Sequence, residues 1–354
     1  MNKSPSKLTQ WFDSDFYTTG AFITSVDGDI VTFGKGGSFS YVSHFKENPR
    51  PVFYLKDFYQ NSYLAYTPGT ILECTRSELD EYLETIKVSK IKTTSPINDD
   101  DIYKKDFEEL KKSFGKDLEK VVLVSREYCG SFEGEDTIKS LLKKAFDFGT
   151  GIPYGMWKND YGVIGSTPEP LYEADFDELR TIALAGTAPI GSEKELINSK
   201  KDQHEHKLVI KDISEKLKPF VLDLTIHETK IHPYKNIVHL KTEIEAEIDE
   251  TIDFTELTNA LSPTAALGGY PKEKSLEFLK HTAYSKKYPE RFFGSCFGLI
   301  SEDTKEFVVS IRNVQWENKS LYVESGGGIV PESILEKELK EIQLKRETIK
   351  HHYL

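Results

Sequence analysis

The chain has 354 residues, of which 38% are hydrophobic, 12% are aromatic and 29% are charged. This composition provides enough apolar material for a sizeable core and excludes a globally disordered protein. The formal net charge of −12 argues against nonspecific binding to nucleic acids or to anionic membranes, so neither is expected as a partner.

Membrane spans, secretory signals and cysteine motifs are also missing from the sequence. No run of about 18 consecutive apolar residues predicts a membrane-spanning helix. The opening segment MNKSPSKLTQWFDSDF has no apolar stretch of the kind that a secretory signal carries. Cys74, Cys129 and Cys296 lie far apart and form no CxxC pattern, which predicts neither a disulfide framework nor a zinc site. We expect a cytoplasmic protein.

The N-terminal part contains short apolar runs that Gly and Pro interrupt, which predicts strands near 21–25, 30–33 and 52–55. The polar stretch 93–101 (TTSPINDDD) predicts a loop that ends in a helix N-cap, because the helical apolar spacing of residues 101–114 follows it. This loop is a candidate boundary between a strand-rich N-terminal part and the rest of the chain.

The remaining elements alternate irregularly between strands and helices. In chain order, the pattern predicts a strand at 120–127, a helix at about 136–148, strands near 161–165, 171–174 and 181–185, a long helix from about 192 to 218, strands near 222–231 and 236–248, helices at 253–261 and 272–281, strands near 296–301, 306–316 and 320–324, and a helix from about 331 to 351. This order has no regular βαβ period, so we predict a large α+β domain.

A carboxylate interrupts the apolar stripe of the long helix predicted at 192–218. Glu205 lies in the middle of a stripe formed by Ile197, Leu208, Val209, Ile213 and Leu217. A carboxylate in such a place must be paired, hydrogen-bonded or bound to a metal. A buried salt bridge, or a position at the edge of the stripe, is the simpler alternative. His204 and His206 cannot share a helix face, so HEH is not a zinc pair.

The C-terminal helix shows the same pattern more strongly, with a stripe formed by Ile334, Glu338, Glu341, Ile342, Lys345 and Ile349. An exposed Glu341–Lys345 pair at i, i+4 is the ordinary explanation and contributes a few tenths of a kcal/mol. Alternatively, two helices that each present an inward carboxylate could together hold a divalent cation. Mg²⁺ favours a few carboxylates together with water and substrate oxygens.

Three further charged residues lie beside apolar strands. Lys120 opens an apolar strand, where a lysine that points inward could act as a general base, and a solvated strand end is the ordinary alternative. Glu169 follows a strand and a Pro turn, and Arg312 lies between apolar neighbours. An inward arginine suits a carboxylate ligand, although a cross-strand ion pair explains it equally well.

Nucleotide-binding and nucleophile motifs are missing: no GxGxxG follows a strand, and neither GxxxxGK[ST] nor GxSxG occurs. The run 326–328 (GGG), between a strand and a helix, is a weak anion-binding signal. The residue pattern therefore predicts a site of carboxylates and cations without naming a reaction.

From about Lys120 onward, the chain resembles the chorismate-utilising enzymes, and within them the isochorismate synthases. The matching segments are LEKVVLVSR (118–126), VIGSTPEPL (163–171), ALAGTAPIG (183–191), SKKDQHEHKLV (199–209), VHLKT (238–242), SPTAALGGYP (262–271), FVVSIRNV (307–314) and GGGIVPESILEKELKEIQLK (326–345). Their order matches that of the family, which makes the resemblance specific. It implies one α+β domain over 1–354, with two packed β-sheets surrounded by helices, a core at about 115–350 and a divergent part at about 1–100.

The resemblance implies isomerisation of chorismate to isochorismate. Lys120 matches the general base, which would activate water for attack at C2 of the substrate. Glu169 matches the general acid, which would protonate the departing C4 hydroxyl. Both groups are needed because water attacks poorly and hydroxide leaves poorly.

Glu205 and Glu341 match the family's Mg²⁺ ligands, and Glu338 lies near them as a candidate for contact through water. The positions that match substrate-binding residues are Gly186, Thr187, His239, Leu267, Arg312, Gly326, Gly327 and Lys345. Because the substrate is a dianion, a dication and cationic side chains must offset repulsion within this acidic protein.

The same comparison indicates the branch of the family. The ammonia-using members generally lack a lysine at the position of Lys120, and Ala185 stands where the aminodeoxychorismate synthases carry a nucleophilic lysine. No glutaminase motif of the CxGxQ kind is seen, so no glutaminase partner is expected. A salicylate synthase, which would go on to eliminate pyruvate, and a non-catalytic chorismate-binding subunit remain alternatives.

Three positions depart from the family pattern, and they concern fine positioning of the substrate. Ala188 stands where Arg is common, Ser262 where His is common, and Ala265 where Pro or Gly is common. The family expectation is a monomer. Whether the product feeds menaquinone or siderophore synthesis stays open.

Overall fold

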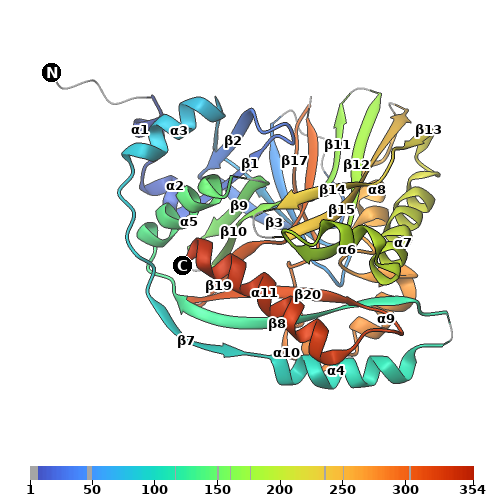
Figure 1. The fold of residues 1–354 in the computed structure, drawn as a ribbon. Coiled ribbons are helices and arrows are strands. Elements are labelled where there is room, and N and C mark those ends of the chain that lie inside the picture. Colours follow the sequence, from blue (N-terminus) through green and yellow to red (C-terminus); the bar gives the residue numbers. More distant parts are fainter. Residues whose placement is uncertain are drawn as a thin grey trace.

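Two antiparallel β-sheets form the centre of the molecule, and helices lie around them (Figure 1). The computed structural model describes residues 7–45, 50–115, 117–149, 151–159, 161–175, 177–234, 237–249, 251–302 and 304–354. This architecture confirms the predicted α+β fold with two packed sheets.

The first sheet contains β8, which begins at the candidate base Lys120. Over the described residues its order is β16 (Gly269–Tyr270), β8 (Lys120–Ser131), β20 (Ser320–Ile329), β19 (Asn313–Glu317), β10 (Tyr161–Thr167), β9 (Ile152–Lys158), β1 (Thr19–Thr24), β2 (Ile30–Lys35) and β6 (Thr70–Thr75). A further strand, β7 (Thr93–Asn98), pairs with β8.

The second sheet contains the strands that carry the AGT and VHL segments. In the described part of the chain its order is β13 (Val221–Ile226), β15 (Ile237–Ile248), β12 (Glu178–Pro189), β11 (Pro170–Asp175), β18 (Lys305–Val309), β17 (Cys296–Ile300), β4 (Val52–Lys56), β5 (Tyr63–Thr67) and β3 (Ser38–Val42). The strand β14 (Lys230–Tyr234) pairs with β15.

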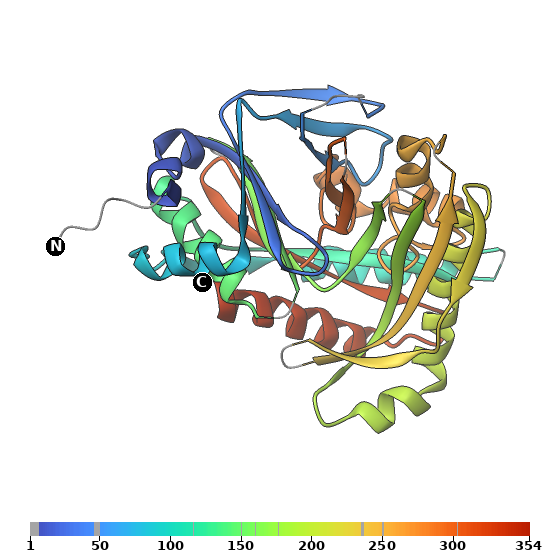
Figure 2. The same cartoon turned by 90° about the horizontal axis from the view of Figure 1, so that it is seen from above.

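Aromatic and aliphatic side chains from both sheets meet in one buried layer. Ile23 and Tyr154 of the first sheet pack there with Phe53 of the second, and the rings of Tyr154 and Phe297 lie 5.4 Å apart. The N-terminal strands β1 and β2 extend the first sheet, and β3 to β5 extend the second. The divergent N-terminal part therefore completes both sheets, at the opposite side of the molecule from α6 (Figure 2).

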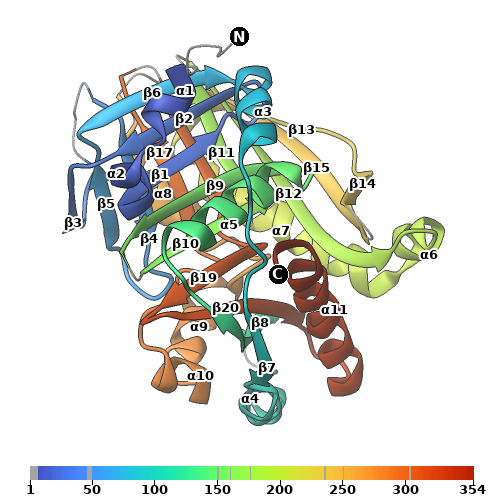
Figure 3. The same ribbon diagram turned by 90° about the vertical axis from the view of Figure 1, so that its left-hand side faces the viewer.

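The helices of the described residues are α1 (Lys7–Trp11), α2 (Ser14–Thr18), α3 (Arg76–Thr85), α4 (Asp100–Ser113), α5 (Glu135–Asp147), α6 (Glu193–Asn198), α7 (Lys200–Leu217), α8 (Phe254–Leu261), α9 (Lys272–Leu279), α10 (Ala283–Lys287) and α11 (Leu335–Tyr353). Helix α11 lies along β20, and α4 lies beside α10 at one end of the first sheet (Figure 3). None of these helices has both the length and the apolar character to cross a membrane. The three cysteines are buried and form no disulfide.

Two predicted elements differ from the structure. The stretch predicted as a loop at 93–101 contains strand β7, because β8 offers it a partner that local propensity does not reveal. The single helix predicted at 192–218 is two helices, α6 and α7. They separate at Ser199, whose Oγ accepts a hydrogen bond from the backbone N–H of Asp202 at 3.2 Å and caps α7.

Two predicted strands are also divided. The strand predicted at 222–231 is β13 followed by β14, with an interruption after Ile226. The strand predicted at 306–316 is β18 followed by β19, which belong to different sheets. Periodicity cannot show this change of sheet, since apolar residues continue on both sides of it.

Candidate active site

Two neighbouring segments pass from one sheet to the other at the same place. One runs from β10 to β11 and carries Glu169, and the other runs from β18 to β19 and carries Arg312. Backbone hydrogen bonds join them, from the N–H of Val309 to the carbonyl of Glu169 at 2.9 Å and from the N–H of Ser166 to the carbonyl of Arg312 at 3.3 Å. Arg312 has a φ of +55°, a left-handed conformation that residues other than glycine rarely adopt.

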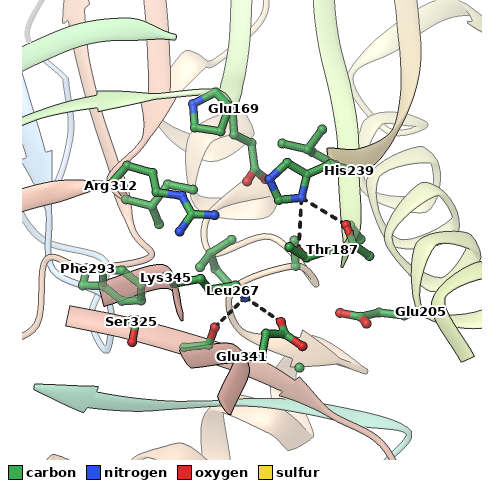
Figure 4. Close-up of a pocket in the computed structure, with 18 of the residues that line it drawn as sticks. Glu169, Thr187, Glu205, His239, Leu267, Phe293, Arg312, Ser325, Glu341 and Lys345 are labelled. Atoms are coloured by element: carbon green, nitrogen blue, oxygen red, sulfur yellow. Dashed lines mark hydrogen bonds and ion pairs between the residues drawn. The ribbon is translucent and has the colours of Figure 1, made fainter. Parts of the chain in front are cut away.

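A pocket with about 730 Å³ of empty space lies at this crossing. Figure 4 shows side chains from both sheets, from α7 and from α11 around it. The predicted site residues that line it are Glu169, Gly186, Thr187, Glu205, His239, Leu267, Arg312, Gly326, Glu341 and Lys345. Lys120, Gly327 and Glu338 lie next to it without lining it.

Glu169 lies in an environment that favours its neutral form. Its side chain is only 3% exposed. Burial raises the pKa of Glu169 to about 8, although the charges of Lys120 and Arg312 act in the opposite direction. The carboxyl group is therefore largely protonated at neutral pH, as a group that delivers a proton must be.

Arg312 presents unused hydrogen-bonding capacity. Its side chain is 6% exposed, and its Nε has no hydrogen-bond partner among the described residues. The guanidinium lies 5.8 Å from the centroid of the Tyr234 ring. A buried guanidinium with a free N–H suits a carboxylate ligand, which would supply the missing charge and acceptor.

Lys120 is fully buried beneath the glycine-rich end of β20. Its Nζ lies 2.8 Å from Oε1 of Glu205, so a lysine at the start of β8 meets a carboxylate of α7. A Cβ at Gly328 would lie 2.5 Å from that same oxygen and 2.6 Å from Cε of Lys120. A side chain at position 328 would displace this pair, so glycine leaves room for it at a position that lines the pocket.

Helix α11 contributes the other carboxylate of the pocket. Nζ of Lys345 donates to Oε1 of Glu341 at 2.7 Å and to the carbonyl of Gly326 at 2.9 Å. Burial would raise the pKa of Glu341, but the Lys345 ammonium lowers it, so Glu341 is ionised. The i, i+4 pair, for which an exposed contact was the ordinary explanation, is thus part of the pocket wall.

The carboxylates of Glu205 and Glu341 point toward one another from α7 and α11 (Figure 4). Glu338 lies one turn before Glu341, is 2% exposed and pairs with Lys201 at 3.2 Å. Within the described ranges, no three Asp, Glu, His or Cys side chains are arranged as a metal-binding group. Two facing carboxylates with adjacent space nevertheless fit a cation such as Mg²⁺, which completes its shell with waters and substrate oxygens.

His239 is held in one tautomer at the opposite wall. Its Nδ1 lies 3.0 Å from the carbonyl of Gly186 and 3.2 Å from Oγ1 of Thr187. Burial lowers the pKa of His239 to about 3, so the ring is neutral. Because a carbonyl only accepts, Nδ1 carries the proton and Nε2 keeps a lone pair, which has no partner in the described part of the chain. Gly186 has a φ of +74° at a register shift of β12.

Sequence reasoning missed several residues of the site. Asp202, Phe293 and Ser325 line the pocket, and Lys201 contacts it through Glu338. Gly328 also lines the pocket and was noted only as part of the glycine run 326–328. Asp202 lies three residues before Glu205, so its place on the same helix face was a usable signal. Phe293 carried no such signal, because its position depends on how a loop packs.

The three departures from the family pattern lie outside the pocket lining. Ala188 packs against a small cluster around Leu196, and Ala265 is fully buried in the core. Ser262 is 1% exposed, and its carbonyl accepts a hydrogen bond from Nζ of Lys272 at 2.8 Å. These small side chains therefore fit local packing rather than direct contact with a ligand.

Comparison with known proteins finds a family model that matches most of the chain. Residues 70–352 match the family model described as "Chorismate binding enzyme". The chain is 30% identical over 243 residues to the isochorismate synthase MenF of Pasteurella multocida, a match that covers 65% of this chain and 56% of that protein. It matches the MenF of Haemophilus influenzae at 30% identity over 55% of this chain and 47% of that protein. The matched part thus spans about half of these relatives.

The structure also resembles the solved structure of MenF, the menaquinone-specific isochorismate synthase from Escherichia coli. The TM-score is 0.81 at 19% identity, and the match covers 97% of this chain and 92% of that one. At this level of identity the likeness shows a shared fold. It extends over the N-terminal strands that the family model leaves out.

Proposed function

The chain belongs to the family of chorismate-binding enzymes, and on that premise we propose that it is an isochorismate synthase, which isomerises chorismate to isochorismate. The observation that carries this proposal is the environment of Glu169. A buried carboxyl group with a pKa of about 8, close to the charges of Lys120 and Arg312, is suited to protonate a leaving hydroxyl.

The base of the proposed reaction is Lys120. Its only ion-pair partner within the described residues is Glu205, at 2.8 Å. In its neutral form the amine would take a proton from a water molecule as that water attacks C2. Glu169 would give its proton to the C4 hydroxyl as the C–O bond breaks. The ring double bonds shift as water adds at C2 and the protonated C4 hydroxyl leaves as water. Return of the proton from Lys120 to Glu169 through solvent restores the enzyme, so the isomerisation is balanced.

Cationic groups at two sides of the pocket would hold the substrate's carboxylates. Arg312 has an unpartnered Nε, and Lys345 lies on α11 next to Gly326. The neutral His239, with a free lone pair on Nε2, would accept a hydrogen bond from a substrate hydroxyl. These groups oppose the acidic net charge of the chain locally, where the anionic substrate would bind.

We include Mg²⁺ in the proposal as the cofactor. Glu205 and Glu341 would hold it, and when bound it would neutralise charge on the substrate's ring carboxylate. The support for this assignment is the two facing carboxylates in the pocket wall.

The experiment that tests the proposal is to incubate the purified chain with chorismate and Mg²⁺ and to separate the products by chromatography. Isochorismate as the product is expected. No isochorismate at any enzyme concentration contradicts the proposal. Salicylate with stoichiometric pyruvate identifies a salicylate synthase instead. Chorismate binding without turnover, also with ammonia or glutamine present, identifies a binding subunit.

A further inference from the structure

Lys201 contacts the candidate metal site from outside the pocket. Its Nζ donates a hydrogen bond to Oε1 of Glu338 at 3.2 Å, which joins the first turn of α7 to the start of α11. The lysine side chain is 35% exposed, whereas that of Glu338 is 2% exposed. Lys201 is therefore the solvent-facing member of an ion pair whose carboxylate is buried.

Glu338 is one of the three carboxylates predicted for the candidate metal site, together with Glu205 and Glu341.

Each of these three carboxylates has its own lysine. Lys120 pairs with Glu205 and Lys345 pairs with Glu341, and both of these pairs belong to the proposed reaction site. The third pair has no such role. Its lysine occupies Oε1 of Glu338, and Oε2 has no hydrogen-bond partner in the part of the chain that the structure describes.

We propose that Lys201 sets the affinity of the site for its cation, by keeping Glu338 from coordinating the ion directly. This inference rests on the proposed function, because it presupposes that Glu205 and Glu341 bind Mg²⁺. Two protein carboxylates balance the charge of the dication and leave open positions for water and for the substrate's carboxylate. A third carboxylate ligand would bind the ion more tightly before the substrate arrives and would give the ion with its ligands a net negative charge, which repels the anionic substrate.

Direct measurement of Mn²⁺ binding to the full chain, without substrate, tests this inference. Free Mn²⁺ is counted by electron paramagnetic resonance during a titration. Lys201→Met is expected to bind Mn²⁺ about tenfold more tightly than the wild type, since one nearby positive charge is lost and Glu338 is released. Lys200→Met removes a neighbouring exposed lysine and is expected to leave the affinity unchanged. Lys201→Gln serves as a second variant if the methionine variant does not fold.

The same change in a Glu338→Gln background separates the inference from a simple effect of charge. We expect Lys201→Met to raise the affinity there by less than about threefold, because no carboxylate is left to be released. An equal gain in both backgrounds, or no gain in either, overturns the inference while the proposed function stands. Wild-type protein that binds no Mn²⁺ overturns the inference together with the metal part of the proposed function.

Discussion

Nζ of Lys120 and Oε1 of Glu205 lie 2.8 Å apart, next to the place where a side chain of Gly328 would be. The contact joins the first residue of β8 to the second turn of α7. It links the proposed base to a proposed metal ligand, and β20 leaves room for it by having glycine at this position. The arrangement makes a small change in β20 a sharp test of the site.

Gly328→Ala is expected to reduce turnover by roughly a hundredfold, because both ends of the Lys120–Glu205 pair must move to admit a Cβ. Gly69→Ala, between β5 and β6, is the control for the glycine-to-alanine change. A Cβ there would meet no atom closer than 3.4 Å and lies away from the pocket lining. Steady-state kinetics and melting temperatures of both variants test the prediction, and equal losses of turnover would contradict it.

The rate of turnover is expected to fall at alkaline pH, with an apparent pKa of about 8, because Glu169 must be protonated to act as the acid. Glu169→Gln cannot release a proton and is expected to lose at least about a thousandfold in kcat. The measurement is kcat between pH 6 and pH 10. A wild-type profile that stays flat through this range removes Glu169 from the role of acid.

Glu169 also affects the stability of the protein. Its pKa is about 8 in the folded chain against 4.5 for an exposed glutamate, so the folded state binds a proton that the unfolded state releases. Protonation of Glu169 adds up to about 5 kcal/mol to the free energy of unfolding. This contribution is complete below pH 4.5 and is lost as the pH rises through 8. Glu169→Gln should therefore become more stable than the wild type as the pH rises. Urea unfolding at pH 5 and pH 9 measures the free energy of unfolding of both proteins. A difference between them that does not change with pH would falsify the burial argument.

Lys120→Met is expected to lower turnover by roughly a thousandfold, because it removes the proposed base. Chorismate should still bind, because Arg312 and Lys345, and not Lys120, are proposed to hold its carboxylates. Lys112→Met, an exposed change on α4, is the control for loss of a positive charge. Calorimetric titration with chorismate reports binding separately from turnover. If the Lys120 variant retains full turnover, the base is another group.

Glu341→Gln is expected to raise the Mg²⁺ concentration required for half-maximal activity by about tenfold or more, since one of two proposed ligands loses its charge. Glu336→Gln alters an exposed carboxylate of the same helix and should have no effect. A chelator should abolish activity in all of these proteins, and Mg²⁺ should restore it. Full activity in the presence of the chelator would exclude the metal from the proposal.

The amino-acid sequence by itself determined which chemical groups the site contains. Glu205 and Glu341 interrupt apolar stripes at helical spacing, and this local pattern survives folding because a helix keeps its faces. Lys120 at the start of a strand and Arg312 between apolar neighbours were visible in the same way. Motif order then assigned these groups to a family, and the match to residues 70–352 confirms that assignment.

Only the tertiary structure decided how these groups meet. Glu169 and Arg312 are neighbours because two segments change sheets at the same point, which depends on strand pairing over more than 100 residues of chain. The roles of Gly328 and Lys201 depend on contacts between α7, β8, β20 and α11, which no local periodicity encodes. The sequence therefore determined the chemistry available, because composition and local spacing are properties of the chain. The fold decided burial, pairing and pKa, because these arise from residues that are distant in the sequence.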